Sequence, residues 1–166
     1  MADSRKERRT GVPANTILDA LRLLARRELS EAQLRQRLAR RGHDPDSIDA
    51  AVTRLKADRS IDDARVAGII ARAETGLRKR GRLRVIRRIE AAGIAPSIAR
   101  QAVDETFREV DNDALMAAAL EKRLRGRTAI ADHREFERLY RFMVGQGFEP
   151  DRVLALLRKL RSRDLQ

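Results

Sequence analysis

A Gly-x-x-Pro motif occurs three times in the 166 residues, and its spacing constrains the fold more than any other feature. The copies begin at Gly42, Gly93 and Gly147, which are 51 and 54 residues apart. Nine and ten residues after each glycine comes a pair of apolar residues, so the register continues beyond the motif. Glycine can end a helix in a left-handed conformation and proline can open the next helix. We therefore predict a threefold repeat in which each motif forms a short turn between helices.

Each repeat is predicted to contain three helices. In the first repeat, apolar residues at helical spacing follow Pro13, which suits a first helical position. A second helix begins at a capping box formed by Ser30 and Gln33 and stops at Gly42. A third follows the turn, with Asp44 as its cap. Its inward face is predicted to carry Ile48, Ala51, Val52 and Leu55.

The fold class predicted from this pattern is all-α, with three tandem three-helix repeats forming an elongated, curved right- or left-handed array. Units of about 50 residues bury little apolar surface alone and must pack on their neighbours. In the second repeat the residues predicted to face inward include Ala64, Ala67, Ile70, Ala71, Leu83, Ile86 and Ile89. The predicted bounds are 1–13 for a disordered basic arm and 14–58, 59–110 and 111–163 for the repeats.

The charge balance indicates an anionic partner. The chain has 37 Lys and Arg against 25 Asp and Glu, a formal net charge of +12. At this size such a field attracts polyanions, which means DNA, RNA or an acidic protein surface. The chain has no cysteine, and we found no long apolar run, so we expect a cytoplasmic protein without disulfides, signal peptide or membrane span.

The densest positive charge lies in residues 78–88, a segment that contains no acid. On a helix that starts near Gly81, the side chains of Arg84, Arg87 and Arg88 should project outward together, on the face opposite Leu83 and Ile86. An ordinary solvated face is the alternative, but such faces intersperse both signs, so we predict unpaired cations and a binding surface. This basic stripe consists of Arg78, Lys79, Arg80, Arg82, Arg84, Arg87 and Arg88.

Two smaller basic clusters are secondary candidates for contact with a partner or with nucleic acid. They lie where cations stabilise a helix C-terminus, and that structural role is sufficient to explain them. The first contains Arg40 and Arg41, and the second contains Lys122, Arg123, Arg125 and Arg127.

The sequence offers no convincing catalytic, metal or cofactor site. Asp62 and Asp63 are adjacent and cannot face one substrate together, so they are better read as helix caps. His43 and His133 have no second ligand at metal-binding spacing, and the glycines match no nucleotide-binding pattern. We therefore predict a protein that is not an enzyme, and a hydrolase using acidic residues is the least favoured alternative.

The order of these elements resembles the RecX family of regulatory proteins. Arg27-Glu28-Leu29-Ser30-Glu31 with Leu34, Leu38 and Gly42 matches one family element, and Ile61-Asp62-Asp63 with Ala67 matches the next. A basic stretch from Gly81 then leads to Gly93-Ile94. The resemblance covers about residues 14–160. It implies helical repeats that bind along RecA filaments on single-stranded DNA, and it implies no cofactor.

Two hypotheses follow for the function. The first is a regulator, expected to be monomeric, that binds RecA–single-stranded DNA filaments and inhibits or modulates their recombinase, ATPase and coprotease activities, with the basic stripe meeting phosphate or acidic loops. The second is a stand-alone basic helical module that binds DNA or RNA, with strong salt dependence and no protein partner.

Overall fold

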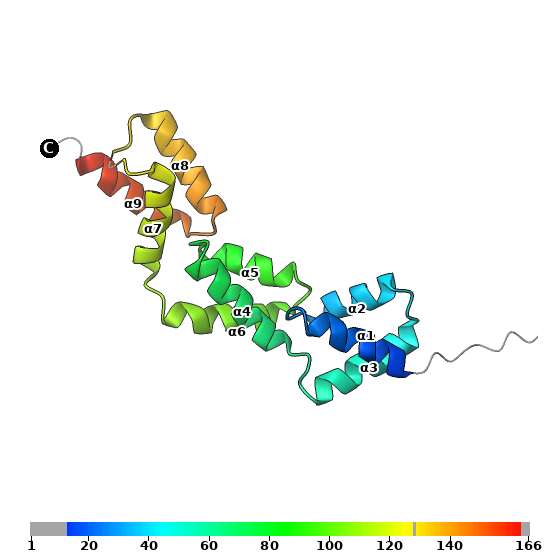
Figure 1. The fold of residues 1–166 in the computed structure, drawn as a ribbon. Coiled ribbons are helices and arrows are strands. Elements are labelled where there is room, and N and C mark those ends of the chain that lie inside the picture. Colours follow the sequence, from blue (N-terminus) through cyan, green and yellow to red (C-terminus); the bar gives the residue numbers. More distant parts are fainter. Residues whose placement is uncertain (1–12, 128, 164–166) are drawn as a thin grey trace, which may run out of the picture. The chain divides into compact units, whose positions relative to one another are not determined.

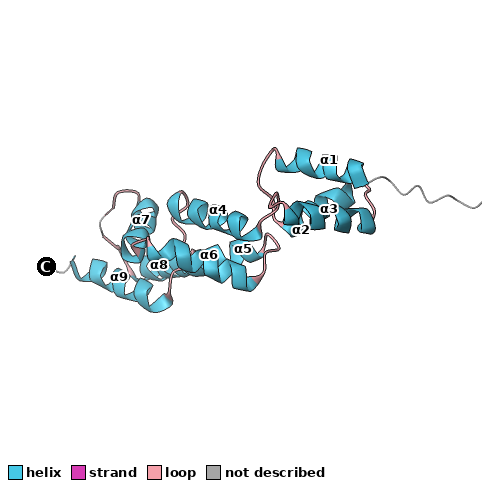
Figure 2. Cartoon of the chain, turned by 90° about the horizontal axis from the view of Figure 1, so that it is seen from below, coloured by secondary structure: helices cyan, strands magenta, loops and turns pink. Residues whose placement is uncertain are grey.

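The computed structural model describes residues 13–127 and 129–163, and within these ranges the regular structure is entirely helical (Figures 1 and 2). The predicted all-α class is therefore confirmed, whereas residues 1–12 of the predicted basic arm lie outside the described residues. The helices are α1 (Pro13–Leu24), α2 (Glu31–Arg40), α3 (Pro45–Ala57), α4 (Asp63–Gly76), α5 (Arg82–Glu90), α6 (Pro96–Arg108), α7 (Asn112–Leu124), α8 (His133–Gly145) and α9 (Pro150–Arg163).

The first compact unit ends at Asp62 and holds α1, α2 and α3. The capping box at the start of α2 is present, because the Gln33 amide donates to Ser30 Oγ at 3.2 Å and the Ser30 amide donates to Gln33 Oε1 at 3.4 Å. Asp44 caps α3 by accepting from the Ser47 amide at 2.9 Å. All four residues predicted for the inward face of α3 are buried.

The second unit begins at Asp63 and holds α4 to α9. Here the predicted inward faces need correction, because Ala64 and Leu83 are exposed, Leu83 by 46%. Val66 and Val85 are buried instead. In both helices apolar residues lie on two adjacent stripes, and tertiary packing selects the stripe that is buried.

Within the described part of the chain, three separate clusters of buried side chains correspond to three groups of helices. One cluster lies among α1, α2 and α3, a second among α4, α5 and α6, and a third among α7, α8 and α9. Phe107, at the end of α6, packs partly buried against both the second and the third cluster. The two groups of helices in the second unit therefore share an apolar contact, although the residue bounds given above for the three repeats stay a prediction.

All three repeat glycines adopt the left-handed backbone that the motif predicts, with φ of 85° at Gly42, 79° at Gly93 and 91° at Gly147. The third turn packs against the start of α5. The Gly81 amide donates to the Gln146 carbonyl at 2.9 Å, and the Leu83 amide donates to the Gly147 carbonyl at 3.1 Å. The end of α8 is thereby fixed beside the first turn of α5, the helix that carries four of the seven stripe residues, Arg82, Arg84, Arg87 and Arg88.

Candidate functional site

Glu74 organises the first part of the basic stripe. Its carboxylate, on α4, is only 5% exposed as a side chain and accepts from the Arg78 guanidinium at 2.8 Å and the Arg80 guanidinium at 2.5 Å. Arg88 Nε lies 3.9 Å from the same carboxylate. A buried carboxylate costs free energy unless it is paired, and these three cations supply the pairing.

Arg82 is directed to a different acid. It forms an ion pair with Asp104 of α6, and its guanidinium carbon lies 5.5 Å from the centroid of the Phe107 ring. The prediction that all seven stripe cations are unpaired is therefore wrong. The segment 78–88 contains no acid, but the folded chain brings acids to it from α4 and α6.

Arg84 and Arg87 make only hydrogen bonds to backbone carbonyls in the interactions seen across the described residues, and neither pairs with an acid there. Arg84 donates to the Gly145 carbonyl at 2.8 Å, and Arg87 Nε donates to the Leu83 carbonyl at 3.3 Å. An open pocket of about 280 Å³, here called the α5 pocket, lies at these side chains. Its lining residues are Arg80, Arg84, Arg87, Arg88, Ala91 and Gly145.

The α5 pocket has the chemistry of an anion site. A guanidinium carries five N–H donors and stays charged at any physiological pH, so one hydrogen bond to a carbonyl leaves most of its donors available. Charge-assisted, often bidentate contacts to phosphate or carboxylate oxygens are the interactions that such a group makes best. Lys79, the seventh member of the stripe, is half-buried in the preceding turn with φ of 53° and does not line this pocket.

The cluster of Arg40 and Arg41 belongs to the first unit and is exposed at the end of α2. Arg41 lies 3.4 Å from the Asp19 carboxylate of α1. His43, in the same turn, has Nδ1 3.0 Å from Thr16 Oγ1 and Nε2 3.0 Å from Asp19 Oδ2. These contacts attach the turn to α1, which is a structural role.

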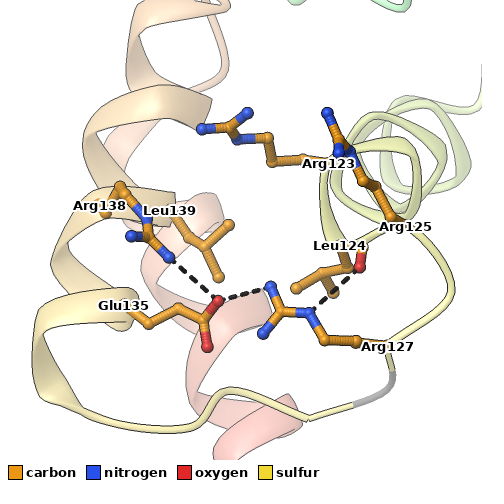
Figure 3. A pocket seen from close by; sticks show the side chains of 7 residues that line it. All are labelled: Arg123, Leu124, Arg125, Arg127, Glu135, Arg138 and Leu139. Carbon is orange, nitrogen blue, oxygen red and sulfur yellow. Dashed lines mark hydrogen bonds and ion pairs between the residues drawn. The ribbon is translucent and has the colours of Figure 1, made fainter.

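The third cluster surrounds a pocket of about 340 Å³ between the end of α7 and the start of α8, here called the α7–α8 pocket (Figure 3). Three of the four predicted cations line it, and Lys122 does not. The lining residues are Arg123, Leu124, Arg125, Arg127, Glu135, Arg138 and Leu139.

The Glu135 carboxylate is buried at this pocket. It accepts from the Arg127 guanidinium at 2.6 Å, from the Ala131 amide at 2.9 Å and from the Arg138 guanidinium at 3.3 Å. The hydrogen bond from Arg127, followed by that from the Ala131 amide, lowers the pKa of Glu135 from 4.5 to about 2. The same ion pair raises the pKa of Arg127, so both groups are charged at neutral pH.

Sequence reasoning missed Glu74, Glu135 and Arg138. A local signal exists for two of the contacts, since Glu74 precedes Arg78 by four residues and Glu135 precedes Arg138 by three. These are the spacings at which side chains meet on a helical surface. The burial of both carboxylates depends on neighbouring helices and has no local signal.

Comparison with known proteins gives one consistent result. A family model described as "RecX, first three-helix domain" matches residues 18–55. The chain is 34% identical over 147 residues to "Regulatory protein RecX" of Halorhodospira halophila, covering 87% of this chain and 88% of the relative. It is 35% identical over 137 residues to the protein of the same name from Chromohalobacter salexigens, covering 81% and 86%.

Two solved structures have the same fold. The crystal structure of RecX from Lactobacillus salivarius aligns with a TM-score of 0.70 at 18% identity, covering 93% of this chain and 97% of that one. A crystal structure titled as regulatory protein RecX aligns with a TM-score of 0.74 at 18% identity, covering 89% and 71%. No described helix of this chain has both the length and the apolar character needed to span a membrane.

Proposed function

The chain belongs to the RecX family of regulatory proteins, and from this premise we propose that it binds RecA recombinase filaments on single-stranded DNA and restrains their recombinase, ATPase and coprotease activities. The relatives carry the name of a regulatory protein, and the chain covers most of their length. A filament of protein on DNA presents a dense array of phosphates, which suits a chain of net charge +12.

The observation that carries the proposal is the α5 pocket. Arg84 and Arg87 line an open cavity, and Arg84 also donates a hydrogen bond to the Gly145 carbonyl. Arg80 and Arg88 line the same cavity while contacting buried Glu74, which fixes their position. Cations held in place before binding lose less side-chain entropy when an anion arrives.

Regulation in this proposal is steric and needs no covalent chemistry. The chain would occupy the filament through the α5 pocket and obstruct the partners or protomers that compete for the same surface. A stand-alone module that binds DNA or RNA remains the alternative, and it requires the same charge but no recombinase.

The test measures RecA-dependent ATP hydrolysis on single-stranded DNA while the chain is titrated at substoichiometric ratios, with DNA binding by the chain alone as the control. Inhibition well below the amount that coats the DNA supports the proposal. Absence of inhibition, with salt-sensitive DNA binding intact, supports the stand-alone module instead.

A pair of matched variants tests the pocket. Arg84→Gln with Arg87→Gln removes two pocket cations, and Arg100→Gln with Arg108→Gln removes two exposed cations of α6 that do not line it. Hydrogen bonds to charged groups are strong enough that the pocket variant should need about tenfold more protein for half-inhibition. Equal inhibition by the two variants would contradict the role of the α5 pocket.

A further inference from the structure

The position of the α7–α8 pocket at the end of a helix does not explain all of the arginines that line it. Cations near a helix C-terminus are stabilised by the helix dipole, and this accounts for Lys122 and Arg123 in the last turn of α7. It does not account for Arg127, which follows the helix, or for Arg138, which comes from α8. Residues from two helices and the connecting loop therefore converge on one cavity.

Buried Glu135 holds two of these cations in place. Its carboxylate contacts the guanidinium groups of Arg127 and Arg138, and Arg127 Nε also donates to the Leu124 carbonyl at 3.4 Å. Figure 3 shows these two cations meeting at the carboxylate, while Arg123 extends from α7 on the other side of the opening. The Arg123 guanidinium lies over the Phe142 ring of α8, 5.1 Å from its centroid, so it too has a defined place.

Charge and polarity indicate the ligand. The lining contains four arginines against one glutamate, so its formal net charge is +3 and an anion can enter without displacing Glu135. Among the described residues that line it, the apolar side chains are Leu124 and Leu139, which are 4% and 2% exposed. The core of a protein–protein interface is enriched in aromatic side chains, and none is among the described residues that line this pocket, whereas a sugar–phosphate backbone is bound mainly through its charge.

We infer that the α7–α8 pocket binds a phosphate group of single-stranded nucleic acid, with Arg123, Arg125, Arg127 and Arg138 as ligands and Glu135 as a positioning residue. This inference deepens the proposed function and rests on it in one respect, because the proposed function supplies single-stranded DNA as the polymer. It does not require the recombinase, since the contact is between this chain and DNA alone. The second unit is thereby assigned a phosphate contact in addition to the one proposed at the α5 pocket.

The experiment measures fluorescence anisotropy of a labelled oligothymidylate with the full chain, at several KCl concentrations and without recombinase. Arg123→Gln with Arg138→Gln removes one pocket cation from each helix. The matched control, Lys122→Gln with Arg134→Gln, removes one exposed cation from each of the same helices outside the pocket. All four positions are exposed, and thermal melts by circular dichroism verify that both variants are folded.

The pocket variant should bind the oligonucleotide about tenfold more weakly than the control variant. Loss of one phosphate contact should also reduce the slope of log K against log salt by about 0.7 for a single strand. Equal affinity and slope in the two variants would overturn the inference, because only total charge would then matter. DNA binding at the control level combined with loss of binding to recombinase would also overturn it, in favour of a protein ligand.

Glu135→Gln tests the positioning role through the sign of its effect. The substitution removes a negative charge, so total charge alone predicts tighter DNA binding. If Glu135 orders the two arginines, binding should instead weaken by about threefold, because their side chains must then be immobilised on binding. Tighter or unchanged binding by the folded variant would overturn the positioning role.

The two proposals fail separately. The α5 pocket is tested by filament inhibition with Arg84 and Arg87 variants, whereas the α7–α8 pocket is tested by binding to DNA alone. Suppose that the Arg84 and Arg87 variant loses filament inhibition while the Arg123 and Arg138 variant binds DNA as well as its control. The proposed regulatory function would then stand, and the phosphate contact at the α7–α8 pocket would be overturned.

Discussion

The first and third Gly-x-x-Pro turns share a motif and a backbone conformation, yet different groups hold them in place. The first turn is attached through side chains, because His43 lies between Thr16 and Asp19 of α1. The third is attached through backbone, because Gly147 packs directly against Gly81 and the start of α5. A repeated motif thus specifies the turn, while particular residues in each copy determine what the turn is attached to.

The difference bears on the candidate site. The first turn lies in the first unit, whereas the third turn lies in the second unit, which also contains the α5 pocket. The Gly145 carbonyl at the end of α8 accepts from Arg84, and Gly145 itself lines the α5 pocket. The position of that pocket therefore depends on the backbone contact between Gly147 and the start of α5. Substitutions in the two turns should therefore differ in how much they lower the free energy of unfolding.

Gly147→Ala should have the largest effect. A methyl group there would lie 2.3 Å from the Arg84 amide nitrogen, and the residue has φ of 91°. Left-handed backbone and an overpacked backbone contact together should lower the free energy of unfolding by about 2–5 kcal/mol. Urea denaturation followed by circular dichroism measures this loss, and a variant as stable as the parent would refute the backbone contact.

Gly81→Ala should have a smaller effect because only the close contact is at stake. Gly81 has φ of −78°, which any residue adopts, but an added methyl group would lie 2.5 Å from the Gly147 carbonyl carbon and oxygen. The expected loss is about 1–3 kcal/mol in the same urea experiment. The comparison would fail if Gly81→Ala were as damaging as Gly147→Ala, because the left-handed backbone would then contribute nothing.

Gly81 also illustrates how far the sequence could predict the fold. Its position before a helix was predicted, because helix spacing, caps and turns depend on residues close together in the chain. Its contact with Gly147 was not predicted, because the partner lies 66 residues away. The same limit explains Leu83, for which apolar spacing alone could not decide between two adjacent stripes on α5.

The candidate site shows the same limit, because its local features could be predicted from the sequence and its long-range contacts could not. Clustered cations are visible in the sequence, and Arg84 and Arg87 do line an open pocket. Their neighbours are neutralised by acids that the fold brings from other helices, as Asp104 is brought to Arg82 across 22 residues. Charge density along the chain therefore indicated the segment that lines the α5 pocket, but it could not separate the cations that pair with acids from Arg84 and Arg87, which contact backbone carbonyls.

Gly42→Ala tests the same comparison in the first turn and should lower the free energy of unfolding less than Gly147→Ala does. Gly42 has φ of 85°, but among the described residues no heavy atom beyond its two chain neighbours lies within 4 Å of an added methyl carbon. Only the cost of left-handed backbone remains, so the expected loss is about 1 kcal/mol. Urea denaturation of the variant measures it. A loss as large as that of Gly147→Ala would show that the first turn is under a constraint that the open space around Gly42 does not reveal.

The smallest effect concerns the acid sensitivity of the first turn. The hydrogen bond with His43, together with the cations Arg22 and Arg41, lowers the pKa of Asp19 below its usual 3.8. The unfolded chain therefore binds a proton at this carboxyl more readily than the folded chain does. The resulting stabilisation is present above pH 3.8 and is lost as the pH falls from there through the folded pKa.

Asp19→Asn isolates this contribution. Glu31 and Glu135 also have lowered pKa values, so the acid sensitivity of the parent mixes several carboxyls. The difference in unfolding free energy between parent and variant should shrink as the pH is lowered through 3.8, because protonated Asp19 and asparagine are both neutral. If the difference in unfolding free energy stays constant with pH, the negative charge of Asp19 does not contribute to attaching the turn. Attachment through the charged Asp19 side chain would then no longer distinguish the first turn from the third.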